Sequence, residues 1–310
     1  MTLCLVSGSG NGSLAEMVGS ALEIELGVCT IERLPDGELR PSVGPMRDAD
    51  VYIIQPTGPP VNEHLVELVL LIDACRRAGA ERLTAVVPYL GYARQDRRDV
   101  AGQAVGVHVV ARAIAACGAD RLIVVDPHTS AIEALFDVQV EMLTAVPVLA
   151  DALKEHIREG AVIVAPDMGA VKLAEHYGSK LDKTVAIVRK VRHSGSEVRV
   201  VEVIGDVGGK PVVIVDDMIS TGATIRAAAQ ALVARGALAD VVVAATHGLL
   251  LSEHVEGPGF PMIGHIFVTD SLPAASTSDV MLSVVSIAPL LADAIHRLHH
   301  GQPLDDLLMR

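Results

Sequence analysis

The chain has 310 residues, and 50% of them are hydrophobic, which is too apolar for a disordered chain and enough for a sizeable core. At ~150 residues per domain, this length predicts two domains or one large α/β domain. Acidic residues outnumber basic ones by 38 to 25, and the net charge of -13 argues against non-specific nucleic-acid binding, which needs a basic field.

Short β-branched runs alternate with longer helical stretches along the chain, a pattern typical of a parallel sheet flanked by helices. Five near-continuous apolar runs predict strands that are buried on both faces: Leu83–Val87, Leu122–Val125, Val162–Ala165, Val212–Val215 and Val241–Ala245. Four stretches between these strands are predicted to be helical: Glu63–Arg77, Gln103–Cys117, Val171–Tyr177 and Ala223–Ala234.

One local pattern occurs three times, as Ala78-Gly79-Ala80, Cys117-Gly118-Ala119 and Arg235-Gly236-Ala237. In each case a Gly stands just after the predicted end of a helix, and a strand begins soon after it. The recurrence suggests one helix–turn–strand unit used in two halves of the chain, with a boundary near residues 144–147.

The C-terminal end is predicted to form a helix over Leu290–Leu298, followed by a loose end. Three histidines, His296, His299 and His300, lie three and four residues apart at its end. Such a set can bind metal on one helical face, but the helix also needs a polar face. We therefore favour a solvated stripe.

The four cysteines are far apart in sequence and show no zinc-ligand spacing, which predicts buried thiols in a reducing compartment. The chain opens directly into the apolar run Leu3–Val6 without a basic targeting region. No apolar run reaches the ~18 residues that a membrane span needs. We therefore expect a soluble, cytoplasmic protein.

The most informative motif follows the predicted strand Val212–Val215. Two carboxylates, Asp216 and Asp217, are followed by a loop of small residues and the start of a helix. The backbone N–H groups of Ser220–Thr224 are placed to hold a phosphate, and the carboxylates to bind sugar hydroxyls or a metal-bound water. An ordinary N-cap would need only one Asp. The stretch resembles the phosphoribosyl-diphosphate motif of type I phosphoribosyltransferases.

Further motifs stand in order before it: Leu34-Pro35-Asp36-Gly37-Glu38, Asn62-Glu63, Tyr89-Leu90-Gly91-Tyr92-Ala93-Arg94-Gln95-Asp96-Arg97-Arg98, Asp126-Pro127-His128 and Ala165-Pro166-Asp167-Met168-Gly169. Together with the Asp216–Thr224 segment, they closely resemble the ribose-phosphate diphosphokinase (PRPP synthetase) family over nearly the whole chain. The Tyr-Ala-Arg-Gln-Asp run is highly specific to that family. A P-loop kinase is excluded at the level of motifs, because the chain contains no G-x-x-x-x-G-K-[ST].

The resemblance implies an α/β protein of two similar phosphoribosyltransferase-like domains, each a mainly parallel sheet flanked by helices. Residues 1–145 would bind ATP and residues 146–310 ribose 5-phosphate, and the terminal helix would belong to the second domain or pack back on the first. In this family the C1 hydroxyl of ribose 5-phosphate attacks the β-phosphorus of ATP and AMP is released. The implied cofactor is Mg²⁺, and neither nucleic acid nor a membrane is expected as a partner.

The resemblance assigns ATP binding to Arg94, Gln95 and Asp96, with Arg94 on the polyphosphate. Taken alone, Arg94 would be interpreted as a surface charge. Asp36 and Glu38 match a loop that family dimers lend to the adenine site of a neighbouring subunit. The protein is therefore expected to be a homo-oligomer built on a dimer that shares the ATP site.

Metal and sugar binding are likewise assigned by resemblance. His128 matches a magnesium-associated histidine of the family, and Asp167 matches a carboxylate near metal and ribose. The positions that match the ribose 5-phosphate site are Asp216, Asp217, Ser220, Thr221, Gly222, Ala223 and Thr224. Lys190 and Arg192 match the family's catalytic loop, where they would stabilise charge on the transferring phosphoryl group. The alternative for these two is a solvated hairpin end.

The sequence departs from the family pattern at several positions. An aromatic residue is common where Leu34 stands, and an acidic one where Ser220 stands. In the regulatory region, Gly102 replaces a usual Arg, while Met142 and Thr144 replace Asn and Tyr. We hypothesise that the enzyme lacks phosphate activation and strong ADP inhibition.

Two other functions compete with this interpretation. A non-catalytic, PRPP-synthetase-like regulatory subunit would keep the fold, but the chain retains the matched site residues. A phosphoribosyltransferase that consumes PRPP would have no need of the N-terminal motifs of the ATP type.

Overall fold

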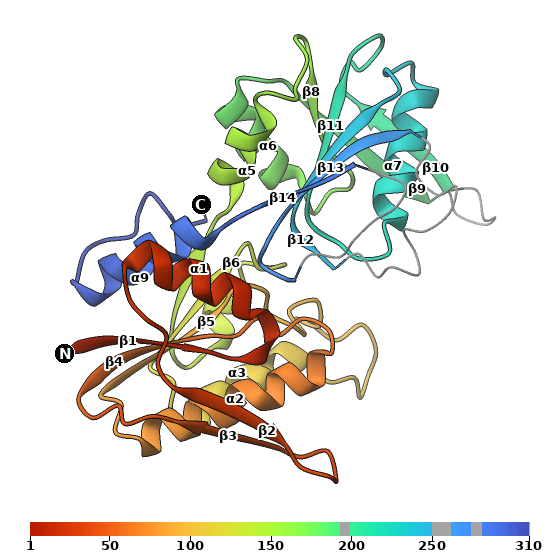
Figure 1. Ribbon diagram of the computed structural model, residues 1–310. Helices are drawn as coiled ribbons and strands as arrows, with labels where there is room; N and C mark the ends of the chain where they lie inside the picture. Colours follow the sequence, from red (N-terminus) through yellow and green to blue (C-terminus); the bar gives the residue numbers. More distant parts are fainter. Residues whose placement is uncertain (193–198, 250–261, 274–280, 310) are drawn as a thin grey trace. The chain divides into compact units, whose positions relative to one another are not determined.

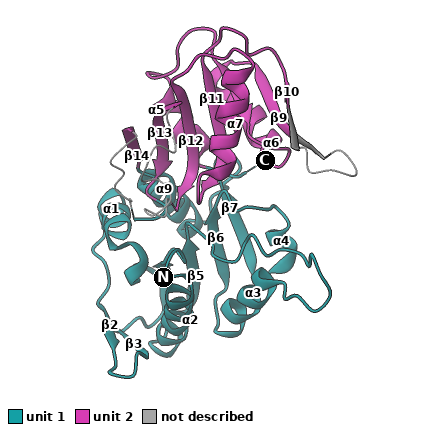
Figure 2. Ribbon diagram, turned by 90° about the vertical axis from the view of Figure 1, so that its right-hand side faces the viewer, with its two compact units in different colours: residues 1–144, 271–273, 286–310 teal, residues 145–270, 274–285 magenta. Residues whose placement is uncertain are grey.

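The computed structural model describes residues 1–192, 199–249, 262–273 and 281–309. Lys190 and Arg192 lie within a described strand, but their side chains lie outside what is described, as do residues 193–198. The chain divides into two compact units, coloured teal and magenta in Figure 2. Unit 1 contains Met1–Thr144, Ser271–Pro273 and Ser286–Arg310, and unit 2 contains Ala145–Asp270 and Ala274–Val285. The functional assignment of two domains stays a prediction.

Unit 1 is built on a five-stranded parallel sheet with the order β1-β4-β5-β6-β7. Its strands are β1 (Thr2–Ser7), β4 (Ala49–Ile54), β5 (Arg82–Val87), β6 (Arg121–Val125) and β7 (Gln139–Leu143). Its helices are α1 (Gly12–Leu22), α2 (Val61–Arg77), α3 (Gly106–Ala116), α4 (Ile132–Leu135) and α9 (Ala288–His299), with a short 3₁₀ turn η1 (Ser9–Asn11). A separate antiparallel hairpin joins β2 (Cys29–Arg33) to β3 (Leu39–Val43).

Both faces of this sheet are covered by helices. Successive side chains of a strand point to opposite faces, so a strand between two helical layers must be apolar at nearly every position. Strand β4 is buried along its whole length. Val51 and Ile53 pack in the core shared with α2 and α3, whereas the equally buried Tyr52 and Ile54 face the side on which α1 and α9 lie (Figure 1).

Unit 2 is built on a seven-stranded sheet with the order β10-β9-β8-β11-β12-β13-β14. All neighbouring strands are parallel except β9 and β10, which form an antiparallel hairpin. The strands are β8 (Val162–Ala165), β9 (Val185–Arg192), β10 (Arg199–Ile204), β11 (Val212–Ile219), β12 (Val241–Gly248), β13 (Ile263–Thr269) and β14 (Met281–Val285). Helices α5 (Val146–Leu153) and α6 (Val171–Leu181) lie on the face opposite α7 (Ala223–Ala234) (Figure 2).

The predicted class, an α/β protein with mainly parallel sheets flanked by helices, is confirmed. The five predicted strands are β5, β6, β8, β11 and β12, and the four predicted helices are α2, α3, α6 and α7. Gly79, Gly118 and Gly236 all have left-handed backbones, with φ of 99°, 103° and 87°. These positions follow α2, α3 and α7, so the recurring tripeptide is a helix C-terminus each time.

Several predictions need correction. Helix α6 ends at Leu181 and not at Tyr177. The segment after α9 is not a loose end, because it pairs with β7. Strand β11 continues beyond Val215 to Ile219, because its backbone keeps pairing with β12. Asp216 and Asp217 therefore lie within the strand rather than after it. Helix α3 begins at Gly106 and not at Gln103. His299 is not part of a solvated stripe: its side chain is only 18% exposed, and Nδ1 lies 2.7 Å from the buried carboxylate of Asp50.

The end of the chain covers the edge strand β7. Thr144 donates its backbone N–H to the carbonyl of Leu307 at 2.9 Å, and Met309 donates to the carbonyl of Met142 at 2.8 Å. Leu143 and Leu308 form an antiparallel bridge. This pairing satisfies backbone groups that an open sheet edge would leave exposed.

The buried thiol of Cys75 packs in the core of unit 1, and burial raises its pKa to about 12. All four cysteines are free thiols as predicted, but only Cys75 is buried, while Cys4, Cys29 and Cys117 are half-buried. Among the described residues, no helix has the length and apolar character needed to cross a bilayer.

Candidate active site

The predicted ATP-binding residues follow β5, where the chain makes a tight turn before a long loop. Tyr92 has a left-handed backbone with φ of 65°, and its carbonyl accepts the N–H of Gln95 at 2.9 Å. Its hydroxyl hydrogen-bonds to Oδ1 of Asn62, in the first turn of α2. The side chains of Arg94 and Gln95 are exposed, and within the described residues Arg94 forms no ion pair. The turn therefore presents an uncommitted guanidinium to solvent.

Asp36 and Glu38 lie at the exposed tip of the β2–β3 hairpin. The tip is closed by its own backbone, since Leu34 donates to Glu38 and Gly37 donates to Leu34. Oδ1 of Asp36 accepts the N–H of Glu38 at 3.1 Å. The hairpin thus projects two carboxylates from a preformed turn.

The first turn of α2 touches both of these segments. Asn62 hydrogen-bonds to Tyr92, as described above, and the next residue, Glu63, forms an ion pair with Arg33 at the end of β2. Arg33 also donates to the carbonyl of Gly37 at 3.3 Å. The structure therefore links the loop of Arg94 to the hairpin of Asp36 through adjacent residues of one helix.

His128 follows β6 and is exposed. Two residues before it, the buried Asp126 has φ of 36° and donates its N–H to the carbonyl of Leu143 at 2.9 Å. The turn that carries His128 is thus attached to the edge strand β7.

Unit 2 gathers three of the predicted carboxylates at the carboxyl ends of two adjacent strands. Asp167 follows β8, and Asp216 and Asp217 belong to β11, which pairs with β8. Burial raises the pKa of Asp216 to about 8, and the negative charges of Asp217 and Asp167 add to this effect. Asp216 therefore mostly carries its proton at neutral pH, beside the carboxylates of Asp217 and Asp167, in the place where the sequence predicts ribose and metal binding.

Only one oxygen of Asp167 is committed to the fold. Its Oδ1 accepts the N–H groups of Gly169 at 2.8 Å and Ala170 at 3.3 Å, just before α6 begins. In the described part of the chain, Oδ2 accepts no hydrogen bond. Asp167 can thus hold its turn and still offer one oxygen to a ligand.

The predicted phosphate loop connects β11 to α7. Gly222 is the N-cap of the helix, and its φ of 69° is a left-handed conformation that glycine adopts at little cost. Thr221 offers its hydroxyl to the N–H of Ala223 at 3.4 Å. The first turn of α7 contains no acidic side chain, so its free N–H groups and dipole favour an anion.

Lys190 and Arg192 lie in β9, opposite Val201 and Arg199 of β10. The described strand carries both residues to its end at Arg192. The rest of the predicted catalytic segment, residues 193–198, is outside the described residues.

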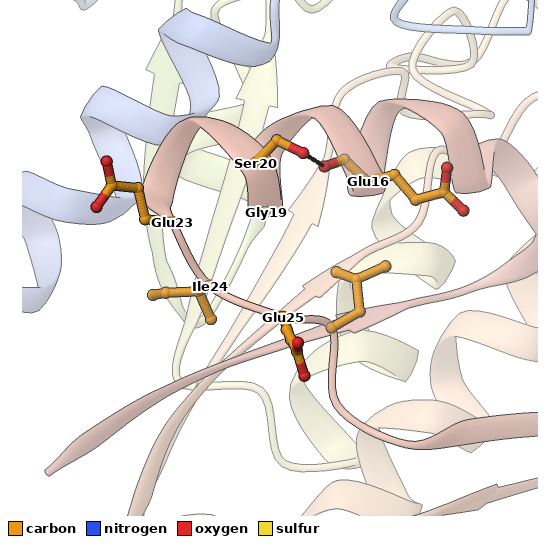
Figure 3. A pocket seen from close by; sticks show the side chains of 7 residues that line it. Glu16, Gly19, Ser20, Glu23, Ile24 and Glu25 are labelled. Atoms are coloured by element: carbon orange, nitrogen blue, oxygen red, sulfur yellow. Dashed lines mark hydrogen bonds between the residues drawn. The ribbon is translucent and has the colours of Figure 1, made fainter.

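A hollow of about 390 Å³ lies elsewhere, beside α1 and the turn that follows it (Figure 3). Its carboxylates, Glu16, Glu23 and Glu25, point away from one another. No predicted site residue lines this hollow, and its negative charge does not suit a polyphosphate.

The comparisons with known proteins agree over the whole chain. Residues 3–118 match the N-terminal domain of ribose phosphate pyrophosphokinase, and residues 192–309 match a phosphoribosyl synthetase-associated domain. The ribose-phosphate pyrophosphokinase of Gloeobacter violaceus is 40% identical over 308 residues, covering 98% of this chain and 92% of its own length. The chain belongs to this family. The ribose-phosphate pyrophosphokinase of Aquifex aeolicus is 38% identical, and the match covers 98% of this chain and 98% of that protein.

The fold agrees as well. A phosphoribosylpyrophosphate synthetase from Mycobacterium smegmatis superposes with a TM-score of 0.90 at 33% identity, covering 97% of this chain and 100% of its own. The family predicted from the motifs is thereby confirmed, together with the fold class and the assignment as an enzyme. The roles of single residues stay predictions.

Sequence reasoning missed the residues that hold these segments in place. Thr57 and Asn62 contact the turn before Arg94, and Arg33 and Glu63 brace the hairpin tip. Asn62-Glu63 was noticed as a family motif, but its contacts were not predicted. Thr57 has no signal in its local sequence, because its partners lie far along the chain.

Proposed function

We propose that the enzyme makes 5-phosphoribosyl 1-diphosphate by transferring the pyrophosphoryl group of ATP to the C1 hydroxyl of ribose 5-phosphate, with release of AMP. The observation that carries the proposal is likeness to ribose-phosphate pyrophosphokinases over 98% of the chain. That likeness includes both groups of motifs, the one after β5 and the one that joins β11 to α7.

In this proposal, unit 1 binds ATP. Arg94 has no ion-pair partner among the described residues, so its guanidinium is available to the polyphosphate. Gln95 and Asp96 follow it on the same loop. Because the turn before Arg94 is already fixed, less conformational entropy is lost when its guanidinium binds the polyphosphate.

Unit 2 binds ribose 5-phosphate. The N–H groups of Ser220–Thr224 receive the phosphate at the start of α7, and Asp216 and Asp217 accept hydrogen bonds from ring hydroxyls. Two carboxylates side by side can each take one of two adjacent hydroxyls. The sugar is thereby oriented through both of its ends.

Magnesium fits the residues present. Within the described residues, no three His, Cys, Asp or Glu side chains form a metal cage. Magnesium is commonly held by one or two carboxylates together with substrate phosphates, so a cage is not required. Asp167 offers an uncommitted Oδ2, in a group of carboxylates whose mutual repulsion a cation would relieve. By likeness to the family, His128 of unit 1 and Asp167 of unit 2 are each proposed to contact magnesium, which when bound would neutralise charge on the phosphates and polarise the reacting oxygens.

The remaining roles follow the same likeness. Lys190 and Arg192 stabilise negative charge on the pyrophosphoryl group as it transfers. Asp36 and Glu38 contact the adenine end of ATP in a neighbouring subunit. The exposed and preformed hairpin tip supports this role, because it extends the carboxylates away from the body of their own unit. The protein is thus a homo-oligomer built on dimers.

Regulation by phosphate and ADP is absent in this proposal. Gly102 stands where the family usually has an Arg. Its φ is 81°, and no atom lies within 4 Å of where a Cβ would be, so this position supplies no side chain to bind phosphate or ADP. At the other two positions, the carbonyl of Met142 and the N–H of Thr144 are hydrogen-bonded to the backbone of the C-terminal segment. Turnover should therefore need no inorganic phosphate.

Two labels of ATP test the reaction. With ³²P at the β position, the label should move into 5-phosphoribosyl 1-diphosphate, and with ³²P at the α position it should remain in AMP. A label at the β position that stays in ADP would instead indicate ordinary phosphoryl transfer and would overturn the proposal.

A further inference from the structure

Thr57 is joined by three hydrogen bonds to the turn that precedes Arg94. It lies between β4 and α2, and only 1% of it is exposed. Its hydroxyl accepts the N–H of Gly91 at 2.7 Å and donates to the carbonyl of Tyr89 at 3.2 Å. Its own N–H donates to the same carbonyl at 2.9 Å.

The turn is also packed directly against this residue. A Cβ at Gly91 would lie 2.6 Å from the carbonyl oxygen of Thr57 and 2.7 Å from Cγ1 of Val61. Such distances leave no room for a side chain. Gly91 therefore approaches Thr57 as closely as backbone allows, and the hydrogen bond to its N–H is the contact that this approach creates.

From Gly91 to Arg94 the chain has little freedom left. Tyr92 is held in the left-handed region and by Asn62, and Ala93 is buried. Arg94 is the next residue and is exposed. The orientation of the guanidinium is therefore set by a turn whose fixed point is Thr57.

We propose that Thr57 is a positioning residue, whose hydroxyl holds the turn 89–92 so that Arg94 meets the polyphosphate of ATP. The naming of ATP rests on the proposed function. The positioning itself concerns contacts within unit 1 alone, and it can be tested in the free protein.

The physical reason is the free energy lost when a buried N–H group has no hydrogen-bond acceptor. Replacing Thr57 by Val keeps the shape of the side chain but leaves the buried N–H of Gly91 without its acceptor. The turn can recover a partner only by moving toward water, and it would carry Arg94 with it. Thr57→Ser keeps the hydroxyl and should keep the turn.

Thr84 offers a matched control. It is a fully buried threonine on β5 in the same unit, and its hydroxyl has no hydrogen-bond partner in the described residues. Thr84→Val is therefore the same chemical change without a lost bond. Its activity should equal that of the unchanged protein, and its stability should be equal or higher, because an unpaired buried hydroxyl is removed.

Trypsin cleavage gives the first measurement, because Arg94, Arg97 and Arg98 are all exposed on this loop. We expect Thr57→Val to be cut after these residues at least about fivefold faster, since loss of a buried hydrogen bond favours local opening. Thr57→Ser and Thr84→Val should be cut like the unchanged protein. Equal cleavage of the Thr57→Val and Thr84→Val variants would overturn the proposal.

Kinetics give the second measurement. Thr57→Val should raise KM for ATP by at least about fivefold and leave KM for ribose 5-phosphate unchanged, because only the ATP loop has moved. If the unchanged protein forms no AMP, the proposed function fails, while the cleavage rates still decide whether Thr57 holds the turn.

A third measurement needs no variant and covers the case in which Thr57→Val does not fold. The amide of Gly91 should exchange its hydrogen more slowly than those of Arg94 and Arg97 in the unchanged protein, because a buried hydroxyl accepts it. Exchange of Gly91 as fast as that of the exposed loop would contradict the proposal.

Discussion

Nδ1 of His299 lies 2.7 Å from Oδ2 of Asp50, although 249 positions separate the two residues in the chain. Asp50 is fully buried at the start of β4, and Nε of Arg82 donates to its other oxygen at 2.7 Å. One carboxylate thus joins β4, which lies between β1 and β5 in the sheet, to the last helix. The C-terminal segment is an integral part of unit 1 for this reason.

Removal of this carboxylate should destabilise unit 1. Asp50→Asn removes the charge and replaces one of the two acceptor oxygens by an NH2 donor that faces Arg82 or His299, and breaking a buried pair in this way costs about 3 kcal/mol. Urea unfolding followed by circular dichroism measures the loss. The matched control is Asp73→Asn, which breaks an exposed pair with Arg77 and should cost no more than about 0.5 kcal/mol. Equal losses in the two variants would contradict the assigned role of Asp50.

The same carboxylate predicts a pH dependence. Burial alone would raise the pKa of Asp50, but the hydrogen bonds from Arg82 and His299 outweigh it and lower the pKa below its ordinary value. A lowered pKa in the folded state means that the stabilisation is complete above the ordinary pKa of Asp, about 3.9, and is lost as pH falls through the folded value. The urea midpoints of the unchanged protein and Asp50→Asn should therefore differ most above about pH 5 and converge progressively as pH falls below the ordinary pKa of Asp. A gap that widens on acidification would refute the assignment.

Substitution of Lys190 should affect the chemical step. Lys190→Ala should lower kcat by about 100-fold or more, because a cation that faces the transferring group stabilises charge in the transition state. The affinity for ATP, measured by calorimetry, should change little. Lys180→Ala removes the same charge from an exposed position on α6 and should leave kcat unchanged. A Lys190→Ala enzyme with full turnover would remove this residue from the mechanism.

A shared ATP site can be tested by mixing subunits. Arg94→Ala damages the loop that a subunit keeps for itself, and Asp36→Ala damages the hairpin that it lends. Each variant alone should be nearly inactive. Co-expressed in equal amounts, they should recover about a quarter of full activity, because half of the dimers are mixed and each of these has one intact site of two. No recovery, with mixed dimers shown by mass spectrometry, would place both residues in the same subunit's site or in none.

Local sequence was sufficient for several buried elements, although β4, which is buried along its whole length, was not predicted. The limits of α7, Ala223–Ala234, were predicted correctly because a left-handed Gly stands on either side of the helix. Strand β8, Val162–Ala165, was predicted correctly because it is apolar throughout and buried on both faces. Both signals are carried by residues adjacent to the element itself.

Two short strands with one exposed face were not predicted. Strands β2 and β3 alternate between exposed and half-buried residues and are too short and polar to stand out. The full length of β11 also escaped prediction, since Asp216 and Asp217 interrupt its apolar run while β12 continues to pair with it. Cross-strand pairing, which the sequence of one strand does not contain, decided these cases.

Long-range partners were the other limit. The polar face of α9 predicted solvated histidines, but the acceptor for His299 comes from the start of β4. Thr57 was not singled out in the sequence, and its partners lie 32 and 34 positions away. The motifs predicted which side chains would bind a ligand, and only the fold showed which contacts hold them.

The most direct test of the account is formation of AMP from ATP, ribose 5-phosphate and Mg²⁺, with and without added inorganic phosphate. We predict AMP and 5-phosphoribosyl 1-diphosphate in equal amounts, at the same rate in both conditions. A folded protein that forms no AMP in either condition would contradict the proposed function, and turnover only with phosphate would contradict the proposed loss of regulation.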